Sequence, residues 1–451
     1  MQLDLVRDLP LGRQLERRLR DLIRTGGLAL GARLPSTRSL AADLGVSRGV
    51  VVGVYAQLAA EGYVTLRRGA LPTVAARGRE PLPVDAETRL DVPIARARFN
   101  LRPDLPDLAL FPRRDWLATE RRALRRAANT DLAYGEPFGA FELRRELAGF
   151  LMRTRGAVGD ADRVNVTAGS GQALFVLALL LRNRGVRRLA VEDPGHRWRT
   201  RVLEESGLEL VPVPVDEGGL DVDALPDVAA VVLAPDHHYP SGVSLAPERR
   251  RALIEWAVAG DRLIVELDFD GHFRYAGPFA GALQAFAPEH VVYVGSASAL
   301  LAPTLRLGWA LLPAALIVPF AELMMTTVGC TARLSQLALA DFIASGCLDR
   351  QLRKARAAYL RRRDVMVETI AKHMPDSRVG EARAGLFAHV SLETDEAAVL
   401  AAARARGIAL DGVNENSLEP RPPGLVVGFA AEPEARLRRA VRELAAACEL
   451  S

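Results

Sequence analysis

Several short polar segments of the chain carry residues suited to binding an anion. Ser170, Gly171 and Gln172 follow the strand-like run 164–166 and begin a long apolar stretch. Small residues at the start of a helix leave backbone N–H groups free at its positive end, which favours a phosphate. A glycine-rich helix start is also common without any ligand, so this segment alone does not establish a binding site.

Farther along the chain, three more residues could bind the same anion. Ser296 and Ser298 carry hydroxyl groups, and Arg306 carries a guanidinium group. These donors suit a phosphate or a carboxylate. We therefore expect a pocket that accepts an anionic group. The residues predicted to line it are Ser170, Gly171, Gln172, His196, His237, Ser296, Ser298 and Arg306.

Histidines in the same part of the chain raise the question of a metal site. His196, His237, His238 and His272 all lie in glycine- or aromatic-rich segments. Metal sites combine such ligands at characteristic spacings. No carboxylate stands at a fixed ligand spacing from these histidines, so the sequence predicts no metal site.

The elements that must position these segments alternate between strand-like and helical patterns from Phe99 onward. Short apolar runs at 189–191, 228–233 and 262–265 are separated by helical stretches rich in Ala, Leu and Arg. This alternation is typical of a buried, mainly parallel sheet flanked by helices. Such α/β folds bind ligands at the carboxyl ends of their strands, which is where the polar segments lie.

The first 75 residues have a different pattern. An apolar stripe at helical spacing from Leu11 to Ile23 is followed by Pro35 and Ser36, which would begin a short helix. Gly45 would end that helix, and Ser47 would cap a second one. Two short helices joined by a glycine-containing turn are typical of a helix-turn-helix. The alternating run 63–66 and the basic residues after it predict a wing, so we expect a winged helix-turn-helix.

The charge distribution favours DNA as the partner of this segment. Residues 1–80 contain 13 Arg against 7 Asp and Glu, a net charge of +6, whereas the whole chain carries +4. Only the N-terminal part is therefore expected to bind a polyanion. A solvated helical bundle with scattered arginines is the alternative, but it does not explain the ordered caps and turn. The predicted DNA-binding residues are Ser36, Thr37, Arg38, Ser47, Arg48, Arg67 and Arg68.

These patterns divide the chain into parts. We expect the DNA-binding domain over 1–76, a linker over 77–98, and an effector-binding or dimerisation domain over 99–451, with a small α+β subdomain from about 345. No apolar run is long enough for a membrane helix, and the N-terminus lacks the pattern of a signal peptide. The three cysteines show no disulfide or zinc spacing, which favours a cytoplasmic setting.

From Leu34 to Tyr63 the sequence resembles the GntR family of bacterial regulators, although its wing, Gly69 to Pro72, departs from the family pattern. The segments from Tyr134 to Gly308 resemble fold-type I aminotransferases, and the whole chain resembles the MocR/GabR subfamily, which joins the two domains. The resemblance implies a DNA-binding transcription regulator, a body that binds pyridoxal 5′-phosphate and senses an amine or pyridoxal phosphate itself, and a head-to-tail homodimer.

The residues for pyridoxal phosphate chemistry are nevertheless replaced. Ala299 stands where the resemblance places the lysine that forms the Schiff base, and a methyl group cannot form an imine. Leu267 and Phe269 stand at the positions of the Asp and Tyr that contact the pyridine ring. Asp268 is one residue out of register, so on a strand it should point to the opposite face. The only two lysines, Lys354 and Lys372, lie in helical segments where a solvated surface position is expected.

Three hypotheses remain open from the sequence. The favoured one is a DNA-binding regulator whose aminotransferase-like body senses a small anionic or amine effector or mediates dimerisation, without catalysis and without covalent pyridoxal phosphate. The second is a regulator of the same kind that binds pyridoxal phosphate non-covalently. The third, a working aminotransferase with an accessory DNA-binding domain, would need a lysine that is missing at position 299.

Overall fold

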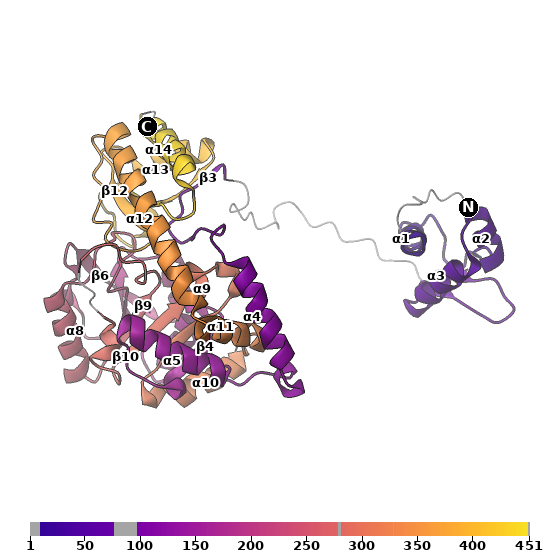
Figure 1. Ribbon diagram of the computed structural model, residues 1–451, viewed down its shortest axis with the longest axis horizontal. Helices are drawn as coiled ribbons and strands as arrows, with labels where there is room; N and C mark the ends of the chain where they lie inside the picture. Colours follow the sequence, from indigo (N-terminus) through magenta and orange to yellow (C-terminus); the bar gives the residue numbers. More distant parts are fainter. Residues whose placement is uncertain (1–9, 76–96, 278–280, 328, 450–451) are drawn as a thin grey trace. The chain divides into compact units, whose positions relative to one another are not determined.

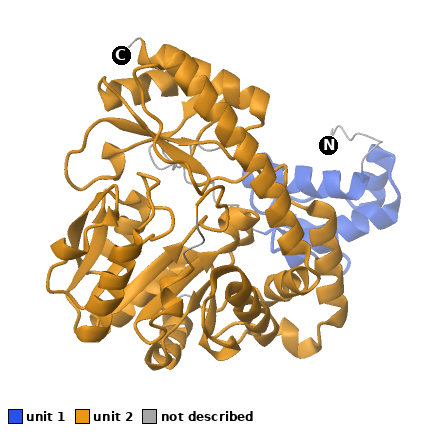
Figure 2. Cartoon of the chain, turned by 60° about the vertical axis from the view of Figure 1, so that its left-hand side comes forward, with its two compact units in different colours: residues 1–92 blue, residues 93–451 orange. Residues whose placement is uncertain are grey.

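The computed structural model describes residues 10–75, 97–277, 281–327 and 329–449 (Figure 1). Contacts divide the chain into two compact units, residues 1–92 and 93–451 (Figure 2). Most of the predicted linker, residues 77–96, lies outside the described residues. Among the described helices, none is both long and apolar enough to cross a membrane.

Unit 1 is a three-helix domain with a small antiparallel sheet. Its elements are α1 (Leu11–Arg24), α2 (Thr37–Leu44), α3 (Arg48–Ala60), β1 (Val64–Thr65) and β2 (Thr73–Val74). Leu15, Leu19 and Ile23 of α1 are buried with Val51 and Leu58 of α3 in one apolar cluster. Val64 pairs with Val74, so residues 66–72 form the loop of a hairpin. This arrangement is the winged helix-turn-helix that the sequence predicts.

Unit 2 is built on an eight-stranded sheet with the order β4-β11-β10-β9-β8-β5-β6-β7. Strands β5, β6, β8, β9 and β10 run parallel, whereas β11 is antiparallel to both of its neighbours and β7 is antiparallel to β6. The predicted mainly parallel sheet is thus confirmed. The strands are β4 (Val164–Thr167), β5 (Arg188–Asp193), β6 (Glu209–Asp216), β7 (Gly219–Leu220), β8 (Ala230–Leu233), β9 (Leu263–Asp268), β10 (Val291–Ser296) and β11 (Gly308–Leu311).

Helices cover both faces of this sheet, and alternate strand residues therefore enter different cores. Tyr293 and Trp309 pack with α5 and α11 in one cluster. Leu267 and Val294 pack with α6 and α10 in another. The helices are α4 (Arg113–Arg126), α5 (Phe141–Arg155), α6 (Ser170–Asn183), α7 (Arg197–Glu204), α8 (Pro247–Ala259), α9 (Ala297–Leu300), α10 (Ala314–Thr327) and α11 (Arg333–Ala344).

The long helix α12 (Cys347–His373) extends from the large sheet to a C-terminal subdomain (Figure 1). That subdomain contains β12 (Phe387–Ser391), α13 (Glu396–Ala405), β13 (Ile408–Ala409), β14 (Asp411–Gly412), β15 (Gly424–Gly428) and α14 (Glu434–Cys448). Strand β3 (Phe99–Asn100), at the start of the described body, pairs in parallel with β13. The C-terminal subdomain therefore also includes a segment from the beginning of the body, which the sequence did not predict.

Candidate functional site

The two helices of the helix-turn-helix begin at the predicted capping residues. Ser36 Oγ accepts a hydrogen bond from Ser39 N–H at 3.1 Å, and Ser47 Oγ accepts one from Val50 N–H at 3.4 Å. Gly45 ends α2 with a φ of 63°, a left-handed conformation that favours glycine. These local interactions set the turn that presents the start of α3 to solvent.

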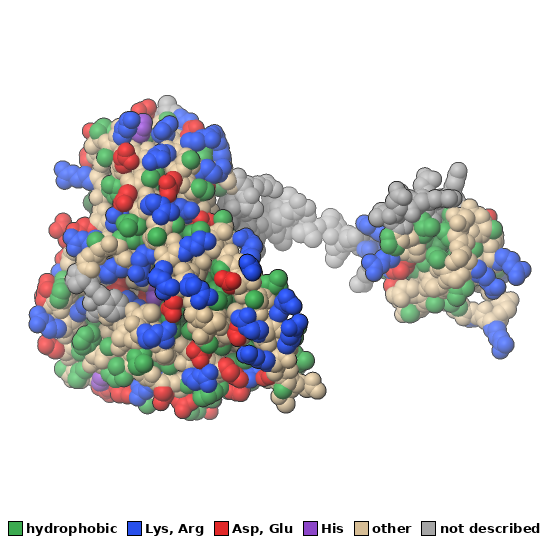
Figure 3. Space-filling model, in the orientation of Figure 1, with side chains coloured by type: hydrophobic (Ala, Val, Ile, Leu, Met, Phe, Trp, Pro, Cys, Tyr) green, Lys and Arg blue, Asp and Glu red, His purple; other side chains and the backbone are tan. Residues whose placement is uncertain are grey.

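The arginines predicted to contact DNA are exposed and available. Arg38, Arg48, Arg67 and Arg68 are exposed and form no ion pair with any described carboxylate. Arg20, by contrast, is bound to Glu16 at 2.5 Å and Glu61 at 2.8 Å. Basic side chains are visible on the surface of unit 1 (Figure 3). Unpaired guanidinium groups at α2, α3 and the wing suit the phosphates and guanine edges of a duplex.

In unit 2 the sheet register assembles the predicted anion cradle. Gly308 of β11 pairs with Thr167 of β4 on one side and with Ser296 of β10 on the other. The helix start at Ser170 and the Arg306 turn are thereby brought to one edge of the sheet. A Cβ on Gly169 would lie 3.6 Å from an Arg306 guanidinium nitrogen, so this group lies beside the glycine turn.

The remaining predicted cradle residues bond to each other or to nearby backbone. Ser296 Oγ accepts a hydrogen bond from Ser298 N–H at 3.1 Å, and the two hydroxyls lie 2.9 Å apart. Gln172 Oε1 accepts a hydrogen bond from Ala168 N–H at 2.5 Å. The structure thus brings together the predicted cradle residues at the start of α6, at α9 and at Arg306.

A tryptophan from α7 covers part of this cradle. A Cβ on Gly171 would lie 3.0 Å from Trp198 Cζ2 and Cζ3, and closer still to Cη2. The indole therefore packs directly on the backbone at the start of α6. Its side chain is still 52% exposed. The indole thus occupies the space beside the Gly171 backbone.

The part of the pocket next to the cradle is nearly filled. Ala299 is 1% exposed and Leu267 is 7% exposed. The guanidinium of Arg199 lies 5.3 Å from the centre of the Phe269 ring. The cavity left beside Leu267 and His196 has a volume of about 30 Å³. That space accommodates a water molecule but not an aromatic ring.

Asp268 points to the opposite face of the sheet, as strand alternation predicts. Its carboxylate accepts a hydrogen bond from the Tyr293 hydroxyl at 2.5 Å and pairs with Arg155 Nε at 2.7 Å. Burial acts to raise the pKa of Asp268, but the Arg155 charge, His272 and the hydrogen bonds from Tyr293 and Gly271 N–H together outweigh it and hold this pKa below its usual value. Arg155 also pairs with Asp236, so Asp268 belongs to a buried ionic network.

Comparison with known proteins decides the family. Residues 11–70 match the profile of the bacterial regulatory proteins of the gntR family, and residues 104–444 match that of aminotransferase class I and II. The chain is 34% identical over 447 residues to the HTH-type pyridoxine biosynthesis transcriptional regulator PdxR of Corynebacterium glutamicum, covering 97% of this chain and 96% of the relative. The "Probable rhizopine catabolism regulatory protein MocR" of Rhizobium meliloti is 30% identical, covering 99% and 95%.

The chain belongs to the MocR-type regulators of the GntR family. As a member of this family it is a transcription regulator that carries an aminotransferase-like domain.

The body of this MocR-type regulator has the fold of solved aminotransferases. An archaeal alanine:glyoxylate aminotransferase matches with a TM-score of 0.73 and 22% identity, covering 78% of this chain and 91% of that one. The kynurenine aminotransferase of Pyrococcus horikoshii matches with a TM-score of 0.73 and 23% identity, covering 82% and 95%. At these identities the matches establish the fold alone.

The pocket residues of this MocR-type regulator do not fit pyridoxal phosphate in the arrangement described. Ala299 offers only a methyl group, which cannot form an imine, and the apolar Leu267 would leave a pyridinium charge uncompensated. The adjoining cavity of about 30 Å³ is too small for the ring. Only the phosphate cradle retains suitable donors, and Trp198 partly covers it.

The four histidines have different hydrogen-bond and ring partners. His196 lies 4.6 Å from the Tyr239 ring, and burial, helped by the Arg199 charge, lowers the pKa of His196 to about 3. His237 Nδ1 lies 3.0 Å from Asp270 Oδ1, and His237 is not among the residues lining the small cavity. His238 Nε2 lies 2.9 Å from the Pro194 carbonyl. Across the described parts of the chain, no group of three His, Cys, Asp or Glu side chains could hold a metal ion.

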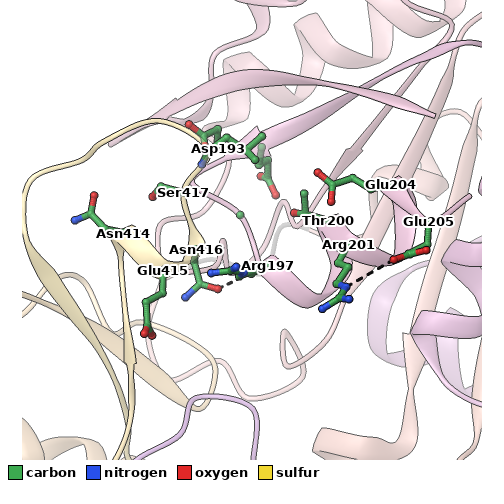
Figure 4. A pocket seen from close by; sticks show the side chains of 13 residues that line it. Asp193, Arg197, Thr200, Arg201, Glu204, Glu205, Asn414, Glu415, Asn416 and Ser417 are labelled. Atoms are coloured by element: carbon green, nitrogen blue, oxygen red, sulfur yellow. Dashed lines mark hydrogen bonds and ion pairs between the residues drawn. The ribbon is translucent and has the colours of Figure 1, made fainter. Parts of the chain in front are cut away.

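Glu192 and the residues around α7 were missed as site residues by sequence reasoning. Glu192 Oε2 accepts a hydrogen bond from Ala234 N–H at 2.9 Å, and burial raises the pKa of Glu192 to about 8. This carboxyl borders both the small cavity and a larger one of about 470 Å³. The larger cavity lies between α7 and the loop 414–418 (Figure 4), where Arg197 N–H donates to Asn416 Oδ1 at 3.1 Å. No short motif marks this contact, because it joins segments far apart in the sequence.

Proposed function

We propose that this regulator binds operator DNA through the start of α3 and the wing, and that its body works without aminotransferase catalysis. The observation that supports the second part is Ala299, a buried methyl group at the position where the family resemblance places the amine on which the chemistry depends. Both lysines of the chain are exposed on α12 and offer no substitute. Binding to chromosomal DNA places the activity in the cytoplasm.

Measuring the affinity for the protein's own upstream DNA as pyridoxal phosphate is added tests this proposal. We expect specific binding whose affinity does not change as the cofactor concentration increases. A change in affinity that persists after borohydride reduction and removal of free cofactor would contradict the proposal, because it would require a covalent bond to the protein. The same titration with pyridoxine, which lacks the aldehyde and the phosphate, is the matched control.

Non-covalent binding of pyridoxal phosphate is a second candidate, favoured by one observation. The glycine turn at 169–171, Ser296 and Arg306 still form a cradle at the sheet edge. Equilibrium dialysis distinguishes the two candidates. Saturable binding that is lost on dialysis supports the second candidate, and its absence supports a body that senses a different ligand or serves dimerisation alone.

We further propose that the body forms a homodimer through an exposed apolar stripe. Trp116 of α4 packs on Phe342 of α11, with ring centroids 5.6 Å apart, whereas Leu117 and Leu124 on another face of α4 are exposed. Leu132 and Tyr134, just beyond this helix, are exposed as well. Exposed large apolar side chains in one part of the chain favour a protein interface. Sedimentation velocity of Leu124→Glu should show a shift to monomer, whereas Val258→Glu on α8 should behave as wild type.

A further inference from the structure

Another cavity of unit 2 lies on the other face of the sheet from Leu267. It has a volume of about 360 Å³ and is bounded by the end of α5, the loop 271–277 after β9, and the first half of α12. Asp268 and Leu267 point to opposite faces of β9, so the strand separates this cavity from the cofactor-like pocket. The volume lies within the range of pockets that hold small metabolites.

Three arginines give this cavity a concentrated positive charge. Arg274, Arg353 and Arg356 line it, and none of them pairs with a carboxylate among the described residues. The spacing of Arg353 and Arg356 places both on one face of α12. Asp349 is the only acidic residue of the lining, and it lies 3.5 Å from Arg153. The sequence between Gly277 and Gly281 contains no acidic residue.

The charge of Arg274 is not balanced by its surroundings. Burial lowers the pKa of Arg274, and the positive charges of Arg155, Arg250 and Arg383 lower it further. Among the described residues, its guanidinium forms one hydrogen bond, a long one of 3.4 Å to the Ala276 carbonyl. Arg155 itself is neutralised by Asp236 and Asp268. A bound anion would remove the repulsion that Arg274 experiences.

The floor of the cavity is fixed and supplies neutral polar groups. Arg356 Nη2 donates a hydrogen bond to the His272 carbonyl at 2.7 Å, which joins α12 to the loop after β9. The His272 ring stacks on Phe150, with centroids 5.3 Å apart. Burial lowers the pKa of His272 to about 4, although Asp268 opposes this shift, so the imidazole is neutral at pH 7. Its Nδ1 is buried without a hydrogen-bond partner in the described structure.

We propose that this arginine-lined cavity binds a small phosphorylated metabolite, with Arg274, Arg353 and Arg356 contacting its phosphate oxygens. Guanidinium groups bind phosphate through paired, charge-assisted hydrogen bonds, and three of them converge here without a protein counter-ion. Basic side chains are frequent along the course of α12 on the face shown in Figure 3. The ligand would connect the loop after β9 to the helix that continues into the C-terminal subdomain. This site does not depend on the proposed function of the other pocket.

Isothermal titration of the full chain with sodium pyrophosphate, at constant ionic strength and in phosphate-free buffer, tests the proposal. We expect saturable 1:1 binding per chain, weakened about tenfold or more in Arg274→Gln and in Arg353→Gln, as loss of a charge-assisted bond implies. Arg404→Gln, which removes an exposed arginine of α13, is the matched control and should bind as wild type. Asp349→Asn removes the one acidic group of the lining and should bind more tightly, which a folding defect would not produce.

Two outcomes would overturn the proposal. One is a heat of binding that does not saturate as pyrophosphate is added and that varies only with ionic strength, because that behaviour indicates non-specific attraction. The other is equal affinity in the Arg274→Gln, Arg353→Gln and Arg404→Gln proteins, because binding would then lie elsewhere. Titration with citrate identifies the anion class: binding tighter than that of pyrophosphate would show a carboxylate site and contradict the phosphate assignment.

Discussion

The indole of Trp198 packs on the backbone of Gly171, at the point where helix α6 begins. In a body with the aminotransferase fold, this helix start is where an anion would be held by free N–H groups. The contact therefore covers part of the anion cradle. Beside the cradle, Leu267 and Ala299 contribute buried apolar side chains. Together these residues leave the pocket with a methyl group at Ala299 and an indole against the helix start.

Replacing Trp198 by alanine should uncover the cradle. We expect Trp198→Ala to gain thermal stabilisation from inorganic phosphate or pyridoxal phosphate that the wild-type protein lacks, since ligand binding to the folded state raises the melting temperature. Phe286→Ala, which removes an exposed aromatic ring elsewhere, should show no such gain. Equal responses of the two variants would mean that the indole does not limit access to the helix start.

The helix-turn-helix gives a prediction about DNA affinity. Arg38→Ala together with Arg48→Ala should weaken binding to the upstream DNA by at least about tenfold and reduce the salt dependence of binding, because two groups that can neutralise phosphates are lost. Fluorescence anisotropy at several salt concentrations measures both effects. Arg24→Ala, at the exposed end of α1, is the control. Unchanged binding by the double variant would show that α2 and α3 do not face DNA.

The caps of this domain give a prediction about stability. Ser47→Ala removes the acceptor for Val50 N–H and should destabilise unit 1 by about 1 kcal/mol. Ser47→Asp keeps an acceptor at this position and should retain most of the stability. Hydrogen exchange at the first turn of α3 in the full chain reports the difference, and equal protection in all three proteins would show that the cap contributes nothing.

Sequence patterns predicted the local features of this protein more fully than its side-chain contacts over long range. Ser36, Gly45 and Ser47 act through neighbours three or four residues away, so their roles are visible in the sequence. Strand alternation likewise predicted that Asp268 faces away from Leu267. The contact between Trp198 and Gly171 depends instead on how α7 packs against α6. No local sequence pattern encodes this packing.

The same limit applies to the arginine-lined cavity and to the C-terminal subdomain. Arg274 and Arg356 are far apart in the sequence and meet only because the loop after β9 reaches α12. The pairing of Phe99 with Ile408 joins residues more than 300 positions apart. Such contacts follow from the complete topology, whereas the motifs that indicate the family are short and continuous.

Glu192 gives a prediction about pH. Because burial raises the pKa of Glu192 to about 8, the folded state holds a proton that the unfolded state releases at lower pH. Stability should therefore fall as the pH rises from about 5 to 8 and level off above that, with a slope of at most about 1.4 kcal/mol per pH unit from this one group. Urea unfolding of Glu192→Gln at pH 6, 7 and 8 should show a flatter dependence than wild type. If the free energy of unfolding changed with pH equally in the two proteins, Glu192 would be ionised in the folded state.

Intact-mass spectrometry after borohydride reduction in the presence of pyridoxal phosphate tests the central claim most directly. The claim is that this MocR-type regulator acts without a covalent bond to the cofactor, because Ala299 stands where the family resemblance places the reactive lysine. We predict no stoichiometric mass increase, and only trace labelling at the exposed Lys354 and Lys372 or the N-terminus. One pyridoxyl group per chain, mapped to a single lysine and formed at a low molar excess of cofactor, would contradict the account.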